Sequence, residues 1–185
     1  MKIAVYSGSF NPLHVGHLAI MRHLTGKDGF DEVYLVVSPQ SPFKDESNRE
    51  SGRDRYEAAV EAVGRHAGLK VRVDDIELGM EPPHYTIRTL DALREREPGN
   101  GFTLVVGADN LESFPRWRDY SRILTEYGIA VFPRKGYHRG RLKAALMKEN
   151  PLYRITLLKA PRIDISSTAI REGTAAGKDM SAYLM

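Results

Sequence analysis

The feature that most constrains the fold is a regular alternation between short apolar runs and longer amphipathic segments along the chain. The short runs are rich in β-branched residues, as expected of buried strands. They predict strands at Ile3–Tyr6, Val33–Val37, Val71–Val73, Thr103–Val106, Ile129–Phe132 and Ile155–Leu158. Helical spacing predicts helices at Val15–Leu24, Arg53–Arg65, Tyr85–Arg96, Tyr120–Tyr127 and Arg139–Lys148. Strands alternating with helices of this length indicate an α/β fold with a doubly wound, mainly parallel sheet.

The length and composition indicate one cytoplasmic domain. With 185 residues, the chain is of the size of a single domain, and we expect it to span residues 1–185. There is no cysteine, which excludes disulfides, thiolate metal sites and cysteine nucleophiles. The apolar stretch at the N-terminus is too short for a secretory signal, and no segment has the roughly 18 apolar residues of a membrane span. We therefore expect no membrane partner.

The net charge of +3 is unevenly distributed. Ten basic residues lie between Pro133 and Arg171, opposed only by Glu149 and Asp164, which gives this part a charge of +8. Such a bias suits a polyanionic ligand, either nucleotide phosphates or a nucleic acid. A solvated helix at about 139–148 accounts for part of it. Aromatic residues are not interleaved with the basic ones, and we therefore expect no nucleic acid partner.

The segment after the first predicted strand, Gly8–His17, carries the clearest functional signal. Gly8 allows a close approach of backbone to a ligand, and His14 and His17 are spaced to share one face of a helix's first turn. The N-terminus of a helix attracts anions, so two imidazoles there predict a phosphate site. A metal site is the alternative, but the segment contains no third ligand and no carboxylate. Capping or packing is the other alternative for each histidine.

The segment after the last predicted strand, Ile165–Arg171, is the second signal. Ser166, Ser167 and Thr168 are typical of a helix start, where their hydroxyls satisfy free backbone N–H groups. Arg171 follows within about one turn, and its guanidinium can bind a phosphate in a fork. Simple capping explains the hydroxyls alone. Together with Arg171 they indicate a second phosphate contact.

Both segments resemble the signatures of the H-x-G-H nucleotidyltransferase superfamily, the first over the ten residues GSFNPLHVGH and the second over ISSTAIR. The resemblance implies a Rossmann-like nucleotidyltransferase fold. It also implies that His14, His17 and Arg171 are catalytic, acting on the phosphates of ATP. The ATP-binding residues that it implies in these segments are Gly8, Ser9, Phe10, Asn11, Gly16, Ile165, Ser166, Ser167 and Thr168.

The middle of the chain is similar to one family of that superfamily, the nicotinate-nucleotide adenylyltransferases. The similar segments are GADN at 107–110 followed by Trp117, YTIRTL at 85–90, SPQSPFK at 38–44 and PRKG at 133–136. The resemblance implies that Gly107 and Asp109 contact the adenosine part of ATP. The acceptor-binding residues that it implies are Lys44, Thr86, Trp117, Arg118 and Arg134.

This resemblance implies transfer of the adenylyl group of ATP to nicotinic acid mononucleotide, which gives deamido-NAD and pyrophosphate. A phosphate monoester has a second pKa near 6, so the acceptor is an ionised nucleophile at pH 7 and needs no general base. We expect Mg²⁺ to be carried by the ATP phosphates, with no metal site in the protein. Nicotinamide mononucleotide and phosphopantetheine are the alternative acceptors. An RNA-binding or nucleotide-sensing module is the remote alternative function. The sequence leaves open whether the protein forms a homo-oligomer.

Overall fold

The computed structural model describes residues 1–39 and 51–185. Its described strands form one six-stranded sheet in the order β3-β2-β1-β4-β5-β6, with every neighbouring pair parallel. The strands are β1 Lys2–Gly8, β2 Glu32–Val37, β3 Val71–Asp74, β4 Gly101–Gly107, β5 Ile129–Phe132 and β6 Ile155–Leu157. The order reverses between β1 and β4, as it does at the switch point of a doubly wound sheet. The predicted α/β fold is confirmed.

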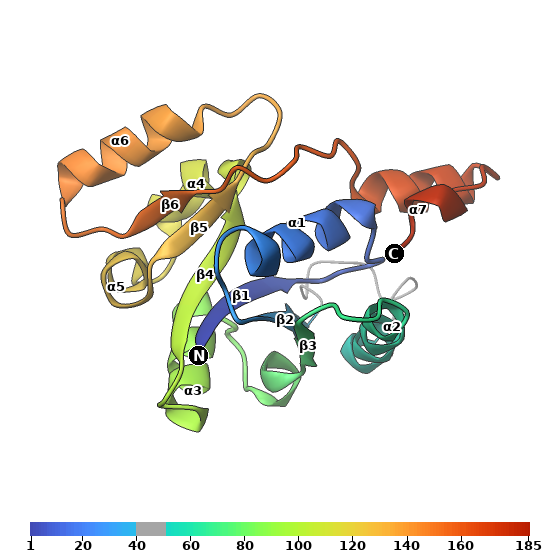
Figure 1. Ribbon diagram of the computed structural model, residues 1–185, viewed down its shortest axis with the longest axis horizontal. Helices are drawn as coiled ribbons and strands as arrows, with labels where there is room; N and C mark the ends of the chain where they lie inside the picture. Colours follow the sequence, from blue (N-terminus) through green and yellow to red (C-terminus); the bar gives the residue numbers. More distant parts are fainter. Residues whose placement is uncertain (40–50) are drawn as a thin grey trace.

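Helices pack on both faces of this sheet (Figure 1). They are α1 Val15–Gly26, α2 Gly52–Gly64, α3 Thr86–Arg96, α4 Ala108–Ser113, α5 Tyr120–Arg122, α6 Arg139–Glu149 and α7 Ser167–Ala175. Short 3₁₀ turns lie at Ile76–Gly79, Phe114–Arg116 and Ser181–Tyr183. The described helices include none long and apolar enough to cross a membrane.

Successive side chains of β1 point to opposite faces of the sheet and belong to two separate layers of the core. Ile3 and Val5 pack with residues of α3, α4 and α6, whereas Ala4 and Tyr6 pack with residues of α1 and α2. This two-residue period is what a strand covered on both faces requires. Burial of these side chains fixes the register of β1 between β2 and β4, and so fixes where its carboxyl end, Gly8, lies.

Two predicted elements differ from the observed ones. The predicted helix Tyr120–Tyr127 is a single α-turn followed by a π-helix at Ile123–Tyr127, which ends at Gly128 with φ of +79°. The predicted helix Arg53–Arg65 is observed as α2 over Gly52–Gly64, because Ser51 caps its start and exchanges hydrogen bonds with Asp54.

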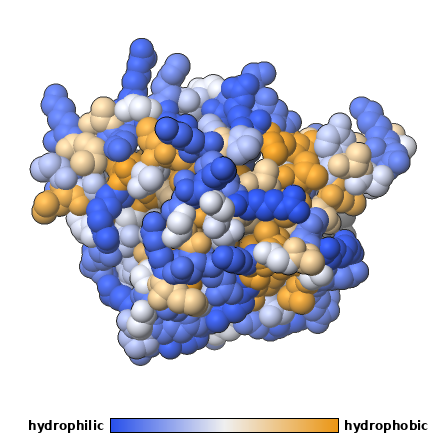
Figure 2. All heavy atoms as spheres, in the orientation of Figure 1, coloured by the Kyte–Doolittle hydropathy of each residue, from blue (hydrophilic) through white to orange (hydrophobic). Residues whose placement is uncertain are grey.

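The basic C-terminal third is spread over α6 and the segments around it. Figure 2 shows hydrophilic side chains over most of this face, with long ones projecting from the edge at which α6 lies in Figure 1. Arg141 and Lys148 of α6 are exposed, as a solvated helix would have them. Arg134 differs, because it is half-buried at the end of β5 beside the cavity described below.

Candidate active site

The segments that carry the two phosphate signals meet at the carboxyl end of β1. A cavity of about 210 Å³ lies there, and its walls include Gly8, Ser9, Phe10, His17, Gly107 and Arg134. Figure 1 shows that α7 begins beside the start of α1, although the two helices are far apart in the sequence. Crevices outside the carboxyl ends of strands, next to a switch point, are where sheets of this kind bind ligands.

His14 and His17 are fixed by a reciprocal cap at the start of α1. The Nδ1 atom of His14 accepts a hydrogen bond from the Gly16 backbone N–H at 3.1 Å. The Nδ1 atom of His17 accepts one from the His14 backbone N–H, also at 3.1 Å. The rings stack with centroids 3.7 Å apart. A Cβ on Gly16 would lie 2.8 Å from the His14 ring, which explains the glycine between the two histidines.

These bonds determine how both imidazoles are protonated. Because each Nδ1 accepts a backbone N–H, the proton of each neutral ring is on Nε2. Burial, and then the positive charge of Arg134, lower the pKa of His14 to about 4. Burial, and then His14 and Arg134, lower the pKa of His17 to about 2. At neutral pH the rings are therefore two uncharged Nε2–H donors.

The start of α7 holds the loop that follows β1. The Ser167 hydroxyl donates to the backbone carbonyl of Pro12 at 2.8 Å. The Arg171 guanidinium donates to the carbonyl of Asn11 and, at 3.1 Å, to the hydroxyl of Thr168. Ser166 caps α7 through its bond from the Ala169 N–H. The capping interpretation thus holds for Ser166, whereas Ser167 and Arg171 join the two signature segments.

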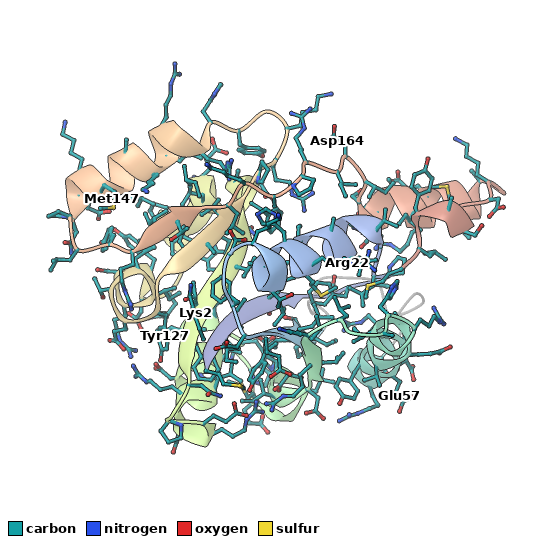
Figure 3. All side chains as sticks on the ribbon, in the orientation of Figure 1. Lys2, Arg22, Glu57, Tyr127, Met147 and Asp164 are labelled. Atoms are coloured by element: carbon teal, nitrogen blue, oxygen red, sulfur yellow. The ribbon has the colours of Figure 1, made fainter. Side chains whose placement is uncertain are left out.

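The connection between β6 and α7 passes over the histidines. Figure 3 shows Asp164 on this connection, between α6 and α7 and above α1. Its neighbours Ile163 and Ile165 line a small hollow together with His14 and His17. The structure therefore places Ile165 against the histidine pair.

Arg134, which follows β5, forms an ion pair with Asp109 in the first turn of α4, beside the cavity. Their Nε and Oδ1 atoms are 3.7 Å apart. Both atoms are shielded from solvent, and neither has a hydrogen-bond partner among the described residues. A Cβ on Gly107 would lie 2.4 Å from Asp109 Oδ1, so this glycine leaves room for the carboxylate. The two side chains thus form an ion pair beside the cavity, in which these two atoms leave their hydrogen-bonding capacity unused.

Three of the predicted acceptor residues, Thr86, Trp117 and Arg118, form a second, more open group. The Arg118 guanidinium lies 4.9 Å from the centre of the Tyr85 ring, which brings the segment after α4 to the start of α3. Thr86 is the first residue of α3 and is half-buried. Trp117 stacks on Phe114 with centroids 4.7 Å apart. Of the other two predicted acceptor residues, Arg134 lines the first cavity and Lys44 lies outside the described residues.

Two buried polar residues behind the cavity were missed by sequence reasoning. Glu77 accepts hydrogen bonds from Thr89 at 2.8 Å and from Ser7 at 3.4 Å, linking the end of β1 to α3. Arg55 of α2 is 1% exposed and bonds backbone carbonyls that follow β1 and β2. Neither residue lies in a recognisable motif. A polar residue on the apolar face of α2 is the one signal that could have revealed Arg55.

The fold and the site geometry define a nucleotidyltransferase. A family model described as cytidylyltransferase-like matches residues 5–173, and the chain is therefore a nucleotidyltransferase of that family. A probable nicotinate-nucleotide adenylyltransferase of Bacteroides fragilis is 36% identical over 99% of this chain and 87% of the relative. One of Flavobacterium johnsoniae is 35% identical over 100% of this chain and 92% of the relative. Within the nucleotidyltransferases, the chain belongs to the nicotinate-nucleotide adenylyltransferase family.

Solved structures show the same fold. A nicotinic acid mononucleotide adenylyltransferase of Plasmodium falciparum complexed with NaAD aligns with a TM-score of 0.78 at 18% identity, covering 99% of this chain and 90% of that chain. A putative nicotinate-nucleotide adenylyltransferase of Vibrio parahaemolyticus aligns with a TM-score of 0.65 at 23% identity, covering 100% and 86%. The predicted family and fold are both confirmed.

Proposed function

We propose that this protein transfers the adenylyl group of ATP to nicotinic acid mononucleotide, releasing pyrophosphate and forming deamido-NAD. The observation that carries the proposal is the pair of neutral, capped histidines facing Arg134 beside the cavity at the start of α1. Membership of the nicotinate-nucleotide adenylyltransferase family supports the choice of acceptor. The function and the family both place the protein in NAD biosynthesis.

In the proposed reaction, an oxygen of the acceptor phosphate attacks the α-phosphorus of ATP. The new P–O bond forms as the bond to the β-phosphate oxygen breaks, and pyrophosphate takes the electron pair. The acceptor phosphate is already ionised near pH 7, so the protein does not need to remove a proton. Its task is to align the two phosphates and to stabilise the charge that develops between them.

His14 and His17 would stabilise that charge through Nε2–H. Because both pKa values lie well below 7, the rings stay neutral and act as hydrogen-bond donors, not as acids. Arg134 would supply a full positive charge next to these two neutral donors. Arg171 would bind the β- or γ-phosphate with donors that remain on its guanidinium, which has five N–H bonds. The backbone of Gly8, Ser9, Phe10 and Asn11 would complete the phosphate contacts, beside Gly16.

The remaining proposed contacts divide between the two substrates. Asp109 would accept hydrogen bonds on the adenosine side, where Gly107 leaves it room. On the acceptor side, Trp117 would stack on the pyridine ring, with Thr86 and Arg118 next to its carboxylate. We also propose Lys44 as an acceptor-side cation from its sequence context.

Mg²⁺, bound to the ATP phosphates, would neutralise part of their charge and that of the departing pyrophosphate. Among residues 1–39 and 51–185, no three His, Cys, Asp or Glu side chains are grouped as a metal site requires. The nearby donor set is instead imidazole, guanidinium and hydroxyl, which suits the phosphate oxygens. Mg²⁺ commonly keeps water and substrate oxygens as ligands, so this set fits a cation brought by the nucleotide.

A paired assay tests the proposal. Purified protein is incubated with ATP and Mg²⁺ and either nicotinic acid mononucleotide or its amide, and the dinucleotide is followed by chromatography. We expect strong preference for the acid. Equal use of both, or preference for the amide, would overturn the acceptor assignment and leave adenylyl transfer intact. Absence of product with either acceptor, from protein that binds ATP, would overturn both.

A further inference from the structure

A buried arginine lies directly behind the loop that follows β1. Arg55 of α2 is 1% exposed and is among the largest fully buried side chains of the described chain. Its Nη1 atom donates to the backbone carbonyl of Ser9 at 2.7 Å and to that of Ser38 at 2.8 Å. A guanidinium is costly to bury unless it is hydrogen-bonded, so these contacts are a specific requirement of the fold.

The loop separates two cavities. In front of it lies the proposed phosphate cavity, walled by Gly8, Ser9 and Phe10. Behind it lies a second cavity of about 220 Å³, which Arg55 lines together with Phe10, Asn11 and Pro12. Arg55 therefore bonds the Ser9 carbonyl from the side of the loop opposite to the proposed ligand.

This contact determines the orientation of one peptide group. In a trans peptide the C=O and N–H bonds point in opposite directions. When the Ser9 carbonyl points back to Arg55, the N–H of Phe10 points forward, to the phosphate side. Phe10 itself has a φ of +47°, a region that non-glycine residues seldom occupy unless their surroundings hold them there. If this peptide turned over, a carbonyl oxygen would face the phosphates in place of a donor.

We propose that Arg55 is a positioning residue that fixes the Ser9–Phe10 peptide so that the Phe10 N–H faces the phosphates of ATP. The proposal rests on the proposed function for its ligand and gives that function a residue outside the signature segments. Arg55 does not touch the nucleotide. It acts on the nucleotide through the backbone of the loop, and its buried positive charge adds to the attraction for anions there.

The test compares Arg55→Met, which removes the charge and keeps the bulk, with Arg55→Lys, which keeps the charge but loses the planar fork. Arg53→Met is the matched control, because Arg53 lies in the same helix with a 55% exposed side chain paired to Asp75. We expect Arg55→Met to lose about 10²-fold in kcat/KM for ATP, the scale of a small misplacement near a reacting centre. The kcat/KM of Arg55→Lys for ATP should lie between those of Arg55→Met and the unaltered protein. The kcat/KM of the Arg53→Met control should equal that of the unaltered protein.

A direct readout separates positioning from a general loss of structure. The chain has six phenylalanines, so ¹⁵N-phenylalanine labelling resolves the Phe10 amide. In the unaltered protein this amide signal should shift when MgATP binds, and in folded Arg55→Met or Arg55→Lys the shift should shrink or vanish. An equal shift in both folded variants, or an unchanged kcat/KM for ATP, would overturn the inference. Because the readout needs only ATP, failure to adenylate nicotinic acid mononucleotide would leave it intact.

Discussion

The two sides of the proposed active site are built differently. On the histidine side, side chains and backbone hold one another: His14 and His17 cap α1, and Ser167 and Arg171 hold the carbonyls of the facing loop. On the acceptor side, Thr86, Trp117 and Arg118 are joined by fewer contacts, among them an exposed cation–π pair with Tyr85. The donors for phosphate are thus fixed before a ligand arrives, whereas the acceptor side has more freedom to adjust. Substitutions on the two sides should therefore affect different kinetic constants.

His17→Ala should have the largest effect. Its Nε2–H donor would be lost, and so would the acceptor for the His14 N–H that completes the cap. We expect kcat to fall by about 10²–10³, the scale of removing one transition-state donor. Steady-state kinetics with saturating ATP and nicotinic acid mononucleotide measure this. Near-normal turnover by the folded variant would remove His17 from the proposed mechanism.

Arg134→Gln should have the next largest effect and should affect both sides. The side chain lies near both histidines and Asp109, so its charge acts at the junction of the two substrates. We expect kcat/KM to fall by roughly 10–100-fold, since a hydrogen bond to a charged group contributes about 1.5–3 kcal/mol. The KM of each substrate, measured separately, shows whether the loss is shared. A change confined to nicotinic acid mononucleotide would assign Arg134 to the acceptor alone.

Trp117→Ala should affect binding more than turnover. We expect KM for nicotinic acid mononucleotide to rise about 3- to 10-fold, because aromatic pairs contribute about 0.5–1.5 kcal/mol beyond area burial. The KM for ATP should change less. Trp117→Phe serves as the control, since it keeps an aromatic face, and it should recover most of the affinity. Equal losses for both substrates in the alanine variant would contradict the division between the two sides.

The last expected effect is on stability and not on kinetics, and it is small near neutral pH and grows only as the pH falls. The folded-state pKa values of His14 and His17 are depressed to about 4 and about 2, below the ordinary value of 6.5. The unfolded chain therefore binds more protons, and stability falls as the pH drops from about 6.5 toward 4. Urea unfolding at several pH values measures this. The pH dependence should be weaker in His17→Gln, and an unchanged dependence would contradict the assigned pKa depression.

The fold was predictable because its signals are local and repeated. Each predicted strand overlaps an observed one, since β-branched runs buried on both faces are distinctive. The π-helix at Ile123–Tyr127 was not predictable, because its apolar pattern also suits an ordinary helix. Propensity and periodicity do not distinguish the two when tertiary packing determines how the helix ends.

For the candidate site, what could be predicted is that its two consecutive motifs lie together. The GSFNPLHVGH and ISSTAIR segments do meet, as their shared position after parallel strands indicated. The protonation of the histidines was not predictable, because it depends on which backbone N–H groups reach Nδ1. Glu77 and Arg55 were missed for a related reason. Their partners lie on other elements, and a charged residue in a sequence is by default assigned to the surface.

The hydrogen bonds between the first loop and α7 also bear on how the protein is synthesised. The bond from Ser167 to Pro12 spans 155 residues, and that from Arg171 to Asn11 spans 160. A ribosome adding about 5–20 residues per second takes roughly 8–30 seconds to make that length. During this interval the nascent chain carries the histidine loop without the helix that holds it. The histidine loop can therefore be held by α7 only after Arg171 has been synthesised, however early the first strands pair.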